Sequence, residues 1–122
     1  MNKFNGVGRL GHDVDLRYTT EGLAVAHFSI AISRPNNKDN KTDWIDCVSF
    51  GKQAEAIHKY FKKGSLIGVT GRIQVDSYEK DGVKRRKWEV YLDKADGFTF
   101  CESKPKEEQI QGFKSADEDI PF

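Results

Sequence analysis

A two-residue alternation of apolar side chains runs through residues 23–33 and again through residues 66–79. A strand that buries one face shows this period, because successive side chains point to opposite sides of a sheet. In the first segment the apolar positions are Ala24, Ala26, Phe28, Ile30 and Ile32. In the second they are Ile67, Val69, Gly71, Ile73 and Val75. The chain is therefore predicted to fold mainly as β-sheet.

Five strands are predicted in all: residues 2–10, 23–33, 43–51, 66–79 and 84–92, with short candidates at residues 16–18 and 98–101. Gly6 and Gly8 lie in the first strand, where glycine permits bulges and sharp coiling. Lys80-Asp81-Gly82 separates the last two long strands, and Asp-Gly is a strong hairpin signal. These two strands are therefore expected to form a hairpin.

Residues 53–61 are the only segment with a helical pattern. Its apolar stripe is Ala54, Ile57, His58 and Phe61, at positions i, i+3, i+4 and i+7. Gly64 suits the position just past the helix end. Five strands with one helix between the third and fourth are the plan of an OB-fold barrel. The predicted fold is all-β with one helix.

Charge divides the chain into a body and a tail. Residues 1–101 hold 17 Lys/Arg against 13 Asp/Glu, whereas residues 102–122 hold 3 against 6. A basic body suggests an anionic partner and an acidic end a cationic one, with solubility alone as the alternative. We predict one domain over residues 1–101, a flexible linker over residues 102–116 and an exposed tip over residues 117–122.

The tip has the sequence Asp117-Glu118-Asp119-Ile120-Pro121-Phe122. Two apolar anchors beside three acids form a peptide that a basic pocket can capture, so these six residues are predicted to bind partner proteins. A solubilising end is the alternative.

No catalytic or metal-binding set is visible. Residues 6–11 match GxGxxG, but no βαβ unit surrounds them, so a glycine-bent strand is the better interpretation. GxSxG and HExxH are absent, and the three histidines are scattered. We predict no enzyme activity and no cofactor.

The predicted location is the cytoplasm. Cys47 and Cys101 are isolated, which favours reduced thiols. No apolar run has the length of a membrane span, and the first residues lack the apolar core of a signal peptide.

Exposed aromatic rings are predicted on two strands. Trp44 and Phe50 share one face of residues 43–51, opposite Ile45 and Cys47, and Tyr78 shares the non-core face of residues 66–79 with Arg72. Bases stack on aromatic rings, at about 1–3 kcal/mol per base, while cations hold phosphates. The alternatives are that Trp44 and Phe50 fill the core and that Tyr78 shields a strand edge.

A basic run, Lys84-Arg85-Arg86-Lys87-Trp88, follows the predicted hairpin turn. Loops at this place in OB-folds contact nucleic acid; charging of an edge strand against aggregation is the alternative. Weaker candidates are single cations, namely Arg9, Lys52, Lys62, Lys63 and Arg72.

Several blocks resemble the bacterial and phage single-stranded DNA-binding protein family. They are Gly8-Arg9-Leu10-Gly11, Leu16-Arg17-Tyr18-Thr19, residues 43–52, Tyr60-Phe61-Lys62-Lys63-Gly64-Ser65, Gly71-Arg72-Ile73 and residues 117–122. The resemblance implies an OB-fold homotetramer that wraps single-stranded DNA and a tip that recruits replication and repair proteins. It also implies stacking by Trp44, Phe50 and Tyr78 and phosphate contacts by Lys52 and Lys63.

The chain departs from the family pattern in three places. Residues 34–42 lack the stacking aromatic of some members, and Arg86 stands where many have an aromatic, with Trp88 two residues later. The linker is short, which suggests a phage protein or a short paralogue. The resemblance places the protein on the nucleoid, or in the host cytoplasm if it is phage-encoded.

We therefore expect sequence-independent binding and protection of single-stranded DNA in replication, recombination and repair. The predicted DNA-binding residues are Trp44, Phe50, Tyr78, Lys52, Lys63, Arg72, Arg86 and Trp88. Two other classes remain open: a protein–protein adaptor built on an OB-fold, and an RNA chaperone of the cold-shock type.

Overall fold

The computed structural model describes residues 1–35 and 41–102. Its elements are β1 (Phe4–Leu10), β2 (Asp15–Tyr18), β3 (Ala24–Ser33), β4 (Thr42–Phe50), α1 (Gly51–Tyr60), β5 (Leu66–Lys80), β6 (Val83–Leu92) and β7 (Phe98–Phe100). Every predicted strand is present within two residues of its predicted bounds, the two short candidates included. Apart from residue 102, the predicted linker and tip lie outside the described residues. Residues 36–40, within the segment that lacks the stacking aromatic, also lie outside them.

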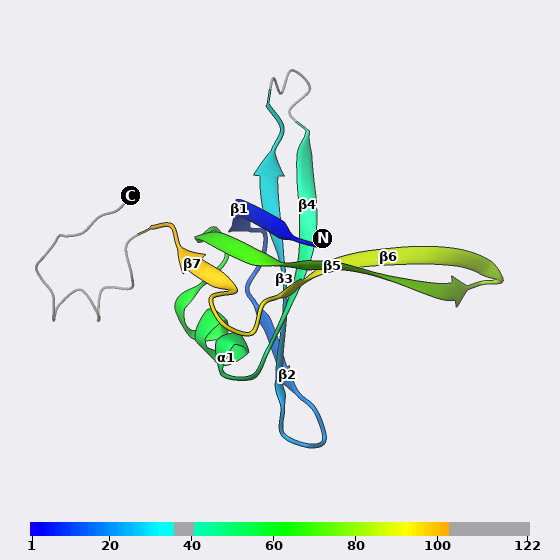
Figure 1. The fold of residues 1–122 in the computed structure, drawn as a ribbon, viewed down its shortest axis with the longest axis horizontal. Helices are drawn as coiled ribbons and strands as arrows, with labels where there is room; N and C mark the ends of the chain where they lie inside the picture. Colours follow the sequence, from blue (N-terminus) through cyan, green and yellow to red (C-terminus); the bar gives the residue numbers. More distant parts are fainter. Residues whose placement is uncertain (36–40, 103–122) are drawn as a thin grey trace, which may run out of the picture.

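Five of the strands close into a ring through their pairings. Figure 1 shows how the elements are arranged. β1 pairs antiparallel with both β3 and β5, β3 pairs with β4, and β5 pairs with β6. A short parallel contact between β4 and β6 completes the ring, through Cys47 with Val90 and Val48 with Tyr91. β2 and β7 extend the sheet beside β3 and β5. The fold is the predicted OB-fold, with α1 between β4 and β5.

The hydrophobic core fills the ring and is closed by α1. The predicted apolar face of β3 is buried from Ala24 to Ile30, and Ala54 and Ile57 of α1 are buried against it. Phe61, just past the helix, stacks on Phe100 at 5.1 Å between ring centroids. A continuous aliphatic and aromatic interior thus holds the barrel together.

The predicted helix differs in detail from α1, which begins at Gly51 rather than at residue 53. His58 is exposed, because it lies at the edge of the apolar stripe, beyond the part of the helix that rests on the barrel. α1 ends at Tyr60, and Phe61 caps it in an extended conformation. Gly64 does have a left-handed φ of 89°, but in the turn that leads into β5 rather than directly after the helix.

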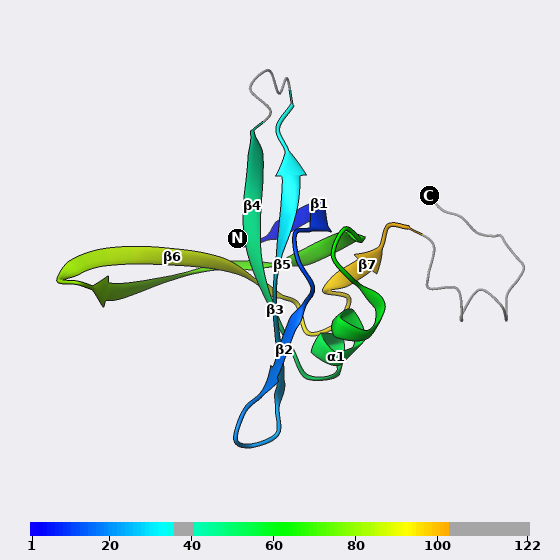
Figure 2. The same ribbon diagram turned by 180° about the vertical axis from the view of Figure 1, so that it is seen from behind.

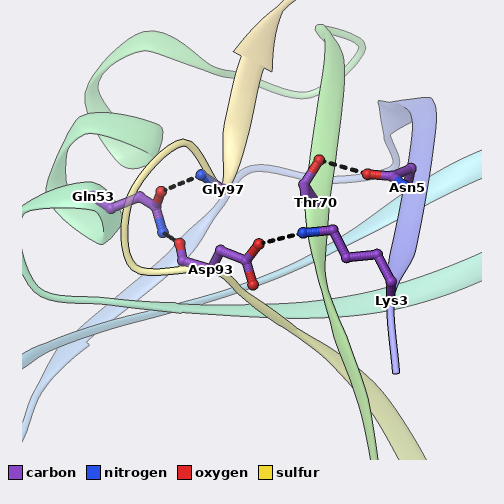
Figure 3. Close-up of polar contacts among 6 residues, drawn as sticks. All are labelled: Lys3, Asn5, Gln53, Thr70, Asp93 and Gly97. Carbon is purple, nitrogen blue, oxygen red and sulfur yellow. Dashed lines mark hydrogen bonds and ion pairs between the residues drawn. The ribbon is translucent and has the colours of Figure 1, made fainter. Parts of the chain in front are cut away.

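The side chain of Gln53 fastens α1 to the segment between β6 and β7 (Figure 3). Its amide nitrogen donates to the Asp93 carbonyl at 2.9 Å, and its oxygen accepts from the Gly97 N–H at 2.9 Å. On the β1 side, Lys3 forms an ion pair with the Asp93 carboxylate at 3.0 Å. These contacts hold the chain around the start of β7 in place.

The β5–β6 hairpin leaves the barrel as a long two-stranded arm (Figures 1 and 2). Asp81 and Gly82 form its turn, with φ of 53° and 76°, as the Asp-Gly signal predicted. Ile73 and Val75 were predicted to lie on a buried face, but they are 37% and 56% exposed. This prediction is wrong because the arm continues past the end of the barrel, where no described residue covers that face.

Candidate nucleic-acid interface

The two faces of β4 divide as predicted. Ile45, Cys47 and Ser49 point into the barrel and are buried, whereas Trp44 and Phe50 are 57% and 42% exposed on the outside. The alternative that these two rings fill the core is therefore wrong. Both rings are open to a ligand on the outer surface of the barrel.

Tyr91 of β6 joins these rings, although sequence reasoning missed it. The ring centroids of Phe50 and Tyr91 are 5.8 Å apart, and the Arg72 guanidinium lies 5.4 Å from the Tyr91 centroid. Val48 is buried beside them, because the parallel contact of β4 with β6 places it next to Tyr91. Burial, with smaller contributions from nearby carboxylates, raises the pKa of Tyr91, so its phenol stays protonated at neutral pH.

The register of the β5–β6 hairpin extends this surface along the arm. Directly opposite residues of an antiparallel pair share a face. The pairs on the side of Tyr91 are Arg72 with Tyr91, Gln74 with Glu89, Asp76 with Lys87, and Tyr78 with Arg85. We call the surface formed by Trp44, Phe50, Arg72, Tyr78, Arg85, Lys87 and Tyr91 the aromatic face.

Trp88 and Arg86 lie on the other side of the same hairpin. Trp88 pairs with Val75 and Arg86 pairs with Ser77, so both point away from Tyr78. We call the surface of Ile73, Val75, Lys84, Arg86 and Trp88 the reverse face. The structure therefore divides the predicted binding residues between two surfaces. A two-residue turn sets the register of a hairpin, so the Asp-Gly signal could have revealed this division.

The single cations fall in different places. Lys52 is exposed in the first turn of α1, two residues beyond Phe50, whereas Lys63 follows the other end of this helix of ten residues, which is about 15 Å long. Arg9 donates to the Gly64 carbonyl at 2.9 Å and to Glu102 at 3.1 Å. Of these two lysines, Lys52 thus lies nearer in sequence to a residue of the aromatic face, and Arg9 already has protein partners.

Three carboxylates lie among the cations of the outer surface, one of them Asp76, which pairs with Lys87 across the hairpin. Asp46 accepts a hydrogen bond from the Ser29 hydroxyl at 2.6 Å. Glu89 is only 9% exposed, with its carboxylate 3.7 Å from the Lys87 ammonium and 4.0 Å from the His27 ring nitrogen. The positive charge of the aromatic face is therefore interrupted by a buried acid near its centre.

Residues 1–35 and 41–102 contain neither a cluster of metal-ligating side chains nor a helix able to span a membrane. No group of three or more His, Cys, Asp or Glu side chains there is arranged to hold a metal ion. No helix in this part of the chain is long and apolar enough to cross a membrane.

An OB-fold barrel that exposes aromatic rings among cations belongs to the class of nucleic-acid-binding barrels. The model of the single-strand binding protein family matches residues 1–98, and the chain belongs to this family. The resemblance drawn from the sequence blocks is thus confirmed, and it agrees with the prediction of a binding protein rather than an enzyme.

Named relatives support the assignment. The single-stranded DNA-binding protein of Halalkalibacterium halodurans is 41% identical, over 96% of this chain and 69% of the relative. That of Oceanobacillus iheyensis is 45% identical, over 85% of this chain and 65% of the relative. Single-stranded DNA-binding protein 2 of Listeria monocytogenes is 40% identical, over 94% of this chain and 71% of the relative. The chain spans about two thirds of the length of these relatives.

Proposed function

We propose that this protein binds single-stranded DNA without sequence preference and shelters it during replication, recombination and repair. The observation that carries the proposal is the exposure of Trp44 and Phe50 on the outside of the barrel. Every base has a flat face, so stacking on these rings does not depend on sequence. The family match and the names of the relatives support the same ligand.

The predicted residues take two roles. Trp44, Phe50 and Tyr78 stack on bases, and Tyr91 extends this series between Phe50 and the arm. Arg72, Lys52, Lys63 and Arg86 contact phosphates, and Trp88 adds a ring on the reverse face. Phosphate contacts release counterions from the DNA, so affinity falls as salt is raised.

Titration of the tryptophan fluorescence with oligo-dT tests the proposal. Binding quenches the emission, and Trp44→Ala weakens affinity by about 5- to 150-fold, the equivalent of one lost stacking contact of 1–3 kcal/mol. Absence of both effects would favour the adaptor function instead. A parallel titration with oligo-rU, if it gave the tighter binding, would favour the RNA chaperone.

The tip over residues 117–122 recruits replication and repair proteins, and the protein acts in the cytoplasm, on the nucleoid, as a homotetramer. The acids and the apolar Ile120 and Phe122 of the tip suit a basic pocket with apolar walls. Deleting residues 117–122 is expected to abolish capture of such proteins without weakening DNA binding. Light scattering that gave a monomer would remove the tetramer.

A further inference from the structure

The β5–β6 arm carries an aromatic ring and cations on each of its two sides. Tyr78, Arg85 and Lys87 lie on the aromatic face. Trp88, with Lys84 and Arg86, lies on the reverse face. A single segment of DNA that lies along one side cannot reach the side chains of the other. A ligand on the reverse face would therefore be a second segment or a second molecule.

We propose that the reverse face is a second track for single-stranded DNA, so that one strand binds the aromatic face first and then passes around the arm to stack on Trp88. This inference rests on the proposed function and adds to it a second segment of the same ligand. The arm would then be enclosed by DNA on both sides rather than lie beside it.

The first support is an exposed apolar strip on an element with little burial of its own. Ile73, Val75 and Trp88 are 37%, 56% and 46% exposed, and Val75 lies directly opposite Trp88. A two-stranded hairpin alone is marginally stable in water, so such rings and aliphatic groups favour a covering ligand. Followed toward the barrel, the side of the hairpin that carries these three residues turns to face the hydrophobic core, where Val90 is buried.

The second support is the charge that accompanies the strip. Lys84 and Arg86 precede Trp88 on the same face of β6, and Glu79, paired with Lys84, is the acid opposite them on β5. Cations beside an aromatic ring suit phosphates and a base. A second copy of the chain that docked through this face about a two-fold axis would place two such cationic patches against each other, with Glu79 as the only paired acid on the face to offset them, which is unfavourable. Charge therefore favours the nucleic acid.

The chain contains two tryptophans, one associated with each surface, which allows the surfaces to be observed separately. Trp88→Phe leaves Trp44 as the reporter of the aromatic face, and Trp44→Phe leaves Trp88 as the reporter of the reverse face. Both variants keep an aromatic ring. Each is titrated with oligo-dT of about 6 and about 16 nucleotides, within the range of site sizes of OB-folds. We expect the short oligomer to quench Trp44 alone and the long one to quench both.

A matched pair of cation variants adds an independent measurement. Arg86→Ala is expected to weaken the binding of the long oligomer by about twofold or more and to leave the short one unchanged, since only the long strand reaches the second track. Arg85 is the adjacent residue in the chain but lies on the aromatic face, so it provides the control. Arg85→Ala is expected to weaken the binding of both oligomers.

Each of the other outcomes is decisive. Quenching of Trp44 with no response of Trp88 at either length overturns the second track and leaves the proposed function standing. Emission of Trp88 that shifts with protein concentration in the absence of DNA overturns it in favour of a second copy on the reverse face. If neither tryptophan responds to DNA, the proposed function itself fails.

Discussion

The indole ring of Trp44 lies directly against Gly11, so closely that a Cβ on Gly11 would collide with the ring at Cζ3. The Gly11 N–H donates to the Ser29 carbonyl of β3 at 3.2 Å, which holds the glycine at the barrel surface. Gly11 therefore provides the space in which the exposed indole rests.

We expect Gly11→Ala to displace the Trp44 ring and to weaken binding of oligo-dT, by less than Trp44→Ala does. Fluorescence titration or anisotropy measures both. The control is the double variant: if Gly11 acts through Trp44, adding Gly11→Ala to Trp44→Ala changes affinity no further. Additive losses would show that Gly11 acts on the barrel instead.

Glu89→Gln is expected to tighten DNA binding severalfold at low salt. The change removes a negative charge from the centre of the aromatic face and releases Lys87 from its carboxylate at 3.7 Å. The dependence of affinity on salt should become steeper, because more cation is available to phosphate. Glu21→Gln, on the exposed loop between β2 and β3, is the charge-matched control and should change little. Unchanged affinity with an unchanged melting temperature would contradict the expectation.

Burial raises the pKa of Cys47 to about 12, which makes stability depend on pH. In the unfolded chain the thiol ionises near pH 8.5, whereas in the fold it stays protonated. Between these values the folded state binds more protons, so the free energy of unfolding falls as pH rises above about 8.5, by at most about 1.4 kcal/mol per pH unit. Urea unfolding at pH 8, 9 and 10 measures this slope. Cys47→Ala should show a shallower slope of unfolding free energy against pH. Equal slopes for the two proteins would show that the Cys47 thiol does not cause this dependence.

Removal of residues 117–122 is expected to tighten DNA binding at low salt. The acidic tip and the basic body carry opposite charges, so the tip competes with phosphates for the same cations. The gain should vanish at high salt, where the attraction is screened. Equal affinity of the full and shortened chains at low salt would refute the competition and leave the DNA-binding proposal untouched.

Much of the fold could be predicted because its signals are local. The alternation in β3, the stripe of Ala54 and Ile57, and the Asp81-Gly82 turn each depend on neighbouring residues only. In β4 the same alternation put Trp44 and Phe50 on one face and Ile45 and Cys47 on the other, and the face of the two rings was predicted to be exposed.

By itself, then, the sequence determined which residues form strands, where the arm turns, and that Trp44 and Phe50 share one side of β4. The tertiary structure alone decided that Tyr91 joins Phe50, that Gly11 supports Trp44, and that Ile73 and Val75 emerge from the barrel. The reason is that side-chain alternation is a property of one strand. Which strands meet, and where the closed barrel ends, depends on contacts between segments far apart in the chain.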